Sequence, residues 1–173
     1  ILVTGGGGWE QYKKELPADL LNTAASTAIM VGAVGGGHYV AHRLKPEQRA
    51  IGEIERAAAY GEFVDQLMAA AEKSKVRKED PETIRQFVAQ RTEATPVRNL
   101  YVPVEAVAEY MQSEGYDGSL DRYADQICEA QATQGDVVIP VADAVAHLAG
   151  TPTWEALREQ ARVEPGGLSR KEA

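Results

Sequence analysis

The chain has 173 residues, of which 44% are hydrophobic and 25% charged, the composition of one globular domain or of a small domain with an appendage. Its 18 basic and 26 acidic residues give a formal net charge of −8, which argues against nucleic-acid binding by phosphate neutralisation, though not against an acidic wall past which DNA slides. Cys128 is the single cysteine, which excludes an internal disulfide framework and a cysteine zinc site; we expect a small buried side chain.

The chain begins with ILVTGGGGWE, a short apolar run followed by four glycines. A dinucleotide site requires G-x-G-x-x-G between a strand and a helix, because the glycines permit a tight turn and close approach to the pyrophosphate. Gly5 and Gly7 fill the first two positions, but the third falls on Glu10, and no G-K-[ST] of a phosphate-binding loop follows. The sequence therefore predicts a flexible glycine-rich lead-in over residues 1–15 and no cofactor site.

Residues 16–45 are predicted to form an alanine- and glycine-rich helix, because no charged residue occurs between Leu20 and His42. At about 1.5 Å per residue this stretch would span about 34 Å, enough for a bilayer core, but its polar residues make insertion of a lone helix marginal. His38 and His42 are four residues apart, yet neither a neighbouring general base nor a third ligand accompanies them. We expect these histidines to form a polar helix end, and we predict no metal site.

Small residues recur every four positions in this segment and so share one helical face: Ala24, Ala28, Gly32 and Gly36. This spacing lets two helix backbones approach closely, as in membrane helix pairs. Two interpretations stay open. The segment is either a buried helix of a soluble assembly, or a helix that packs in an oligomer or enters a membrane. Self-association fits both.

Residues 46–95 are predicted to form amphipathic helices. The first begins at Pro46 and continues through AAAEKSK. We expect its apolar face to form the core rather than to bind a partner's groove, and the residues at helical spacing on this face are Ile51, Ile54, Ala58, Val64, Leu67, Met68 and Ala71. The segment VRKEDP is expected to be a turn. PETIRQFVAQRT then reads as a shorter helix that directs Ile84, Phe87 and Val88 inward.

Residues 96–173 are predicted to form a small α+β module around two similar units, NLYVPVEAVAEYMQSEG and DVVIPVADAVAHLAG. Each unit is a short β-type run, then Pro, then Val and an alanine-rich helix that ends at Gly. We expect the two strands to pair, with helices covering one side. The side chains expected in the core of this module are Val102, Val104, Ile139 and Val141.

The sequence signals for the other elements of residues 96–173 are weaker. Residues 119–132 read as a helix, and the tail offers a short helix with Trp154 and Leu157 inward, followed by a Pro-Gly-Gly turn. Glu105 and Asp143 occupy comparable early-helix positions, but acidic residues are common there because of the helix dipole. No nucleophile–base pair can be assembled from three histidines and one cysteine, so we predict no catalytic site and no enzymatic activity in this chain. The fold class expected is α+β, predominantly helical.

The region from Lys73 onward resembles a block found in large tailed-bacteriophage proteins. The motifs that carry the resemblance are LYVPVEAV, GDVVIPVADAVAHLAGT and the ending LSRKEA. These proteins resemble the virion internal proteins that are ejected with the genome, and the large polyvalent phage proteins. Their parents often carry a lytic transglycosylase domain elsewhere, but nothing in this chain matches its catalytic glutamate motif. The initial Ile, and Ser169 as a possible cap for a further helix, lead us to expect a piece of a longer chain.

The resemblance implies a structural and assembly module of a phage ejection protein, located in the capsid interior or tail and in the host envelope after ejection. It would be a homo-oligomer that contacts other ejection, portal or tail proteins, contacts the host membrane, and passes DNA without binding it specifically. An alternative is an accessory domain that positions a peptidoglycan-cleaving region of the parent chain. A third option is a fragment of a bacterial effector or toxin.

Overall fold

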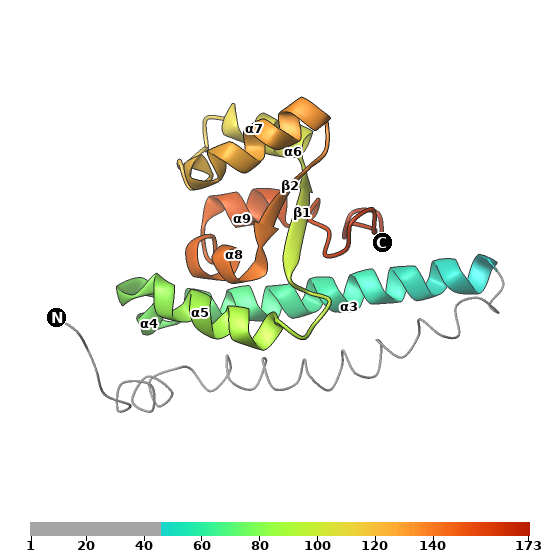
Figure 1. The fold of residues 1–173 in the computed structure, drawn as a ribbon, viewed down its shortest axis with the longest axis horizontal. Coiled ribbons are helices and arrows are strands. Elements are labelled where there is room, and N and C mark those ends of the chain that lie inside the picture. Colours follow the sequence, from blue (N-terminus) through green and yellow to red (C-terminus); the bar gives the residue numbers. More distant parts are fainter. Residues whose placement is uncertain (1–45) are drawn as a thin grey trace.

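The computed structural model describes residues 46–173. The predicted lead-in (1–15) and the predicted charge-free helix (16–45), including Ala24, Ala28, Gly32 and Gly36, lie outside the described residues. The first described elements are α3 (Pro46–Glu72), α4 (Lys75–Glu79) and α5 (Pro81–Thr92). Figure 1 shows α3 as the longest of them, running along one side of the described part, with α4 and α5 beside it.

The segment expected to be a turn before α5 contains the short helix α4. Ser74 lies before its first residue, is fully buried, and accepts a hydrogen bond from the Arg77 backbone N–H at 3.3 Å. This side-chain cap satisfies one of the backbone donors that a helix start leaves free. Ser74 is the sequence signal for this helix start. The residues after it are almost all charged, so they lack the apolar spacing by which a helix is recognised.

The next elements are β1 (Asn99–Pro103), α6 (Val104–Met111), the 3₁₀ helix η3 (Asp121–Tyr123), α7 (Ala124–Thr133), β2 (Asp136–Pro140), α8 (Val141–His147) and α9 (Pro152–Leu157). The helix expected over 119–132 therefore begins later, because Gly118 has a positive φ of 79° and the Asp117 side chain accepts from Ser119 N, which holds a turn. α9 directs Trp154 and Leu157 inward, as predicted.

The predicted pairing of the two strand–Pro–helix units is confirmed. β1 and β2 form a two-stranded antiparallel sheet in which Leu100 lies opposite Ile139 and Val102 opposite Val137. Each strand ends at its proline, and α6 and α8 begin at the next residue. Proline has no N–H to donate to a ladder but fits a helix start, so one residue both closes the strand and opens the helix. The fold class is α+β and predominantly helical.

One hydrophobic core joins the long helices to the sheet. It takes Leu67 from α3, Ile84 and Phe87 from α5, Leu100 from β1 and Ile139 from β2, all nearly inaccessible to solvent. α5 packs closely against α8, which brings the second strand–Pro–helix unit onto the helical layer (Figure 1). Residues 46–95 and 96–173 thus share a single core.

The apolar pattern of α3 does not follow one face along the whole helix. Val64, Leu67, Met68 and Ala71 are buried as expected, but Ile51 is 56% and Ile54 40% exposed, and Ala58 is also exposed. At about 100° per residue, Val64 is rotated by about 120° from Ala58, whereas Ile51, Ile54 and Ala58 lie within about 60° of each other. The prediction that all seven face the core was therefore wrong for the first three.

Candidate functional site

A tight turn near the C-terminus forms one wall of a hollow in the described part of the chain. Gly167 N donates to the Glu164 carbonyl at 3.0 Å, and Gly166 between them has a φ of 67°. A type II β-turn requires positive φ at its third residue and favours proline at its second, which are Gly166 and Pro165 here. The sequence EPGG thus specifies the turn locally.

Two anchors hold the ends of this turn segment in place. Before the turn, Arg162 exchanges two backbone hydrogen bonds with Tyr101 of β1, at 2.8 and 2.9 Å. After the turn, the Arg170 guanidinium donates to the Gly61 carbonyl and pairs with Asp65, both on α3. A Cβ atom at Gly61 would lie 2.7 Å from Arg170 Nε, so a side chain at this position would force the Arg170 side chain to shift.

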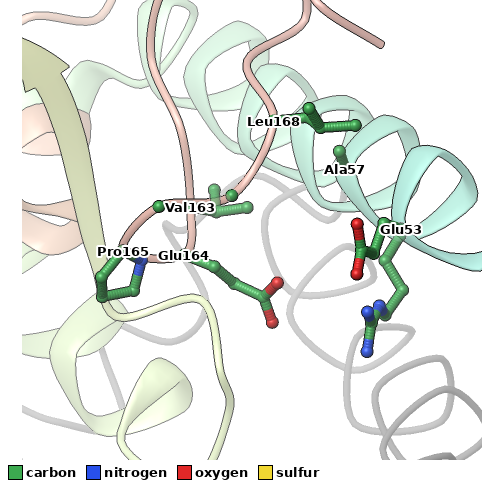
Figure 2. A pocket seen from close by; sticks show the side chains of 9 residues that line it. Glu53, Ala57, Val163, Glu164, Pro165 and Leu168 are labelled. Carbon is green, nitrogen blue, oxygen red and sulfur yellow. The ribbon is translucent and has the colours of Figure 1, made fainter. Parts of the chain in front are cut away.

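The hollow between α3 and the turn has a volume of about 200 Å³. It is lined by Glu53, Arg56 and Ala57 of α3 and by residues 163–168. Figure 2 shows the carboxylates of Glu53 and Glu164 facing the same space, with the apolar side chains of Ala57 and Leu168 beside it. The hollow, which we call the α3 hollow, is therefore acidic at its rim and partly apolar along its walls.

One buried polar atom of the α3 hollow has no hydrogen-bond partner among the described residues. Arg56 Nε is buried and has no hydrogen-bond partner. Burial raises the pKa of Tyr60, one turn further along α3, and the negative charge of Glu164 raises it further, while Arg56 opposes the shift. Two carboxylates and one guanidinium thus give the α3 hollow a net negative charge, and an N–H donor of Arg56 remains to be satisfied.

A second polar cluster lies where α9 meets the loop before η3. The Thr153 hydroxyl is fully buried; it donates to Asp117 Oδ1 at 2.8 Å and lies 2.5 Å from the Ser119 hydroxyl. The hydrogen bonds from Ser119 and Thr153 lower the pKa of Asp117. Because each of these groups has a partner, the cluster has the character of a structural tie between the loop and α9.

Charged groups also gather where α5 meets α8. Arg85 binds Glu82 through two hydrogen bonds, at 2.5 and 2.7 Å, and its other nitrogen lies 3.8 Å from Asp143. The Arg85 hydrogen bond lowers the pKa of Glu82 to about 2. Burial lowers the pKa of His147, and the positive charge of Arg122 in η3 lowers it further.

The structure places the predicted core residues inside and separates the two early-helix carboxylates from each other. Val102, Val104, Ile139 and Val141 are all buried. Glu105 is exposed, whereas its counterpart Asp143 pairs with Arg85. The two carboxylates therefore have different environments. Cys128 is exposed, contrary to the expectation of a buried side chain, because α7 turns Ile127 and Ala130 toward the core and Cys128 away from it.

The α3 hollow was not predicted from the sequence. Its walls come from segments that are far apart in the chain, and the Pro-Gly-Gly turn was the only part of it with a local signal. Within residues 46–173, no group of three or more His, Cys, Asp or Glu side chains is arranged to hold a metal ion. Among the described helices, none has the length and apolarity needed to span a bilayer.

Comparisons of the chain with protein-family models, with curated proteins and with solved structures find no match. The geometry of the described residues is therefore the basis for a functional proposal. Within residues 46–173 it includes the α3 hollow and an exposed apolar face on α3.

Proposed function

We propose that the chain is a structural and assembly module of a bacteriophage internal virion (ejection) protein. It self-associates and contributes to a conduit that carries the genome across the host envelope. The family in this proposal rests on the sequence resemblance from Lys73 onward. The observation that carries the assembly role is an exposed apolar face of α3, made of Ile51, Ile54 and Ala58, which we call the α3 stripe.

The α3 stripe is suited to contact between chains because the core does not use it. Ile51 and Ile54 are two of the three large hydrophobic side chains that are exposed within the described residues; the third is Val138 of β2. Neighbouring exposed apolar residues on one helix face support helix–helix association, since burying them removes apolar surface from water. We take a second copy of the chain as the partner of the stripe. The net charge of −8 fits a wall along which DNA passes without binding.

The oligomeric state of the full chain tests the assembly role. We expect the wild-type chain to form an oligomer in sedimentation velocity, and Ile51→Asp combined with Ile54→Asp to shift it to the monomer without lowering its thermal stability. Val138→Asp, which changes the other exposed apolar side chain, should leave the oligomer intact. A wild-type chain that stays monomeric at all accessible concentrations would contradict the proposal.

The location in the virion is tested separately. We expect antibodies or mass spectrometry to detect the chain in purified phage particles, and to find it in the host envelope fraction after adsorption. Its absence from the particles would contradict the ejection role. Self-association would then be the only part of the proposal left to test.

A further inference from the structure

We propose that the α3 hollow binds a lysine or arginine side chain of a partner polypeptide. The proposal is independent of the α3 stripe and of the phage assembly role. It rests on the shape, the charge and the unsatisfied hydrogen-bond donor of the hollow.

The size of the α3 hollow fits one side chain better than a small-molecule ligand. Its volume is about 200 Å³. Pockets for drug-sized ligands and cofactors usually measure at least about 300 Å³. A single long side chain entering from a neighbouring polypeptide is therefore the class of ligand that the space admits.

The charges select a basic side chain. The carboxylates of Glu53 and Glu164 face the hollow from α3 and from the turn (Figure 2). A cationic head group placed between them would gain two charge-assisted contacts, while its aliphatic stem would lie against Ala57 and Leu168. An acidic or neutral side chain of similar length would gain neither contact.

The unpaired hydrogen-bond donor of Arg56 favours a polypeptide ligand over a free cation. Its Nε is buried without a hydrogen-bond partner, and a buried donor gains free energy when it finds an acceptor. A side-chain rotation that brings Arg56 Nε into the hollow would let it donate to a backbone carbonyl next to the bound lysine, whereas a simple amine or a metal cation has no acceptor to offer. Arg56 therefore favours a peptide over an inorganic ion.

The rigidity of the hollow supports the same conclusion. The turn is held on one side by the two Arg162–Tyr101 backbone hydrogen bonds, and on the other by Arg170 on Gly61 and Asp65. A site whose walls are already held in place loses little conformational entropy when it binds.

The experiment is an NMR titration of the full chain with two blocked tripeptides, acetyl-Ala-Lys-Ala-amide and acetyl-Ala-norleucine-Ala-amide. The two have similar stems, and only the first carries a charge. We expect the lysine peptide to shift the amide signals of Ala57, Gly166 and Gly167 in a saturable manner, and the norleucine peptide to leave them unchanged. Raising the salt from about 50 to about 500 mM should weaken the binding, since the contacts are electrostatic.

Variants then assign the contacts. Glu164→Gln should weaken lysine-peptide binding about threefold, as expected for a partly exposed ion pair, and Glu53→Gln by a similar factor. Glu62→Gln removes an exposed carboxylate of α3 that does not line the hollow, and it should leave binding unchanged. Equal shifts from both peptides, no shift from the lysine peptide, or full affinity in Glu164→Gln would each overturn the proposal. Sedimentation of Glu164→Gln should still show the wild-type oligomer, which separates this result from the test of the α3 stripe.

Discussion

Tyr101 and Arg162 exchange two backbone hydrogen bonds, from Tyr101 N to the Arg162 carbonyl at 2.8 Å and from Arg162 N to the Tyr101 carbonyl at 2.9 Å. They form an isolated antiparallel bridge on the side of β1 that does not face β2. An unpaired strand edge is a site for pairing with other chains. The bridge pairs the middle residue of this edge and also fixes the position at which the chain turns toward α3.

The alternation of burial along β2 gives a direct test of the sheet. Ile139 is 1% exposed and Val138, its neighbour on the opposite face, is 38% exposed. We expect Ile139→Asp to lower the unfolding free energy by at least about 3 kcal/mol, because it buries an unpaired carboxylate. Val138→Asp should cost less than about 1 kcal/mol. Urea denaturation of both variants measures the difference, and similar losses would contradict the register.

Two glycines of α3 make a matched pair for the Arg170 anchor. A Cβ at Gly52 would meet nothing within 4 Å, so Gly52→Ala should raise the unfolding free energy by roughly 0.5–1 kcal/mol through helix propensity. The same change at Gly61 would place the Cβ 2.7 Å from Arg170 Nε, and the displaced side chain would lose its contacts with Asp65 and the Gly61 carbonyl. We expect Gly61→Ala to be about 1 kcal/mol less favourable than Gly52→Ala.

The double variant identifies the cause. If Arg170 is responsible, Gly61→Ala introduced into an Arg170→Ala background should be as favourable as Gly52→Ala, since the neighbour that the Cβ meets is gone. An unchanged deficit at Gly61 would show that the cost arises within α3 itself.

His147 makes the stability of the α5–α8 contact dependent on pH. Its pKa in the folded chain lies below its ordinary value of 6.5 because it is buried and near Arg122; Arg85 acts in the same direction, and Asp143 and Glu82 act against it. The folded state therefore binds a proton less readily than the unfolded state. The stability contributed by neutral His147 is complete above pH 6.5 and is lost as the pH falls toward the folded pKa.

Comparison with His147→Gln isolates this contribution, since the carboxylates are the same in both chains. The difference in unfolding free energy between the wild type and the variant should be constant above about pH 7 and should decrease in favour of the variant toward about pH 5. A difference that does not vary over this range would show that His147 is solvated as in the unfolded chain.

The parts of the fold that the sequence predicted are those with local causes. Proline ends both strands and begins both following helices, and these two units were recognisable from the residues around Pro103 and Pro140 alone. The burial of Ile84 and Phe87 followed from helical spacing within one short helix. In each case, residues within one turn or one strand carried the information.

What the sequence did not reveal depends on contacts between distant segments. Helical periodicity separates Ile51 and Ile54 from the later apolar residues of α3, but it does not show which of the two faces meets the core. Cys128 was expected to be buried from residue type alone, while its position on α7 placed it outside. The α3 hollow requires Arg170 to reach Asp65, a pairing between opposite ends of the described chain.

The charge-free segment before α3 has small residues at every fourth position. If Ala24, Ala28, Gly32 and Gly36 form a closely packed helix face, a side chain larger than a methyl group cannot fit there. Gly32→Leu would hold the helices apart and remove contacts along the whole face.

A substitution on the opposite face is the matched control. Val31→Leu also enlarges an apolar side chain, but beside Thr27 and Val34, where we expect it to be tolerated. Gly32→Leu should therefore disrupt the oligomer and Val31→Leu should not, as measured by cross-linking and light scattering. If the two variants behave alike, the segment does not use its small residues to associate, and the conduit role would then depend on the α3 stripe alone.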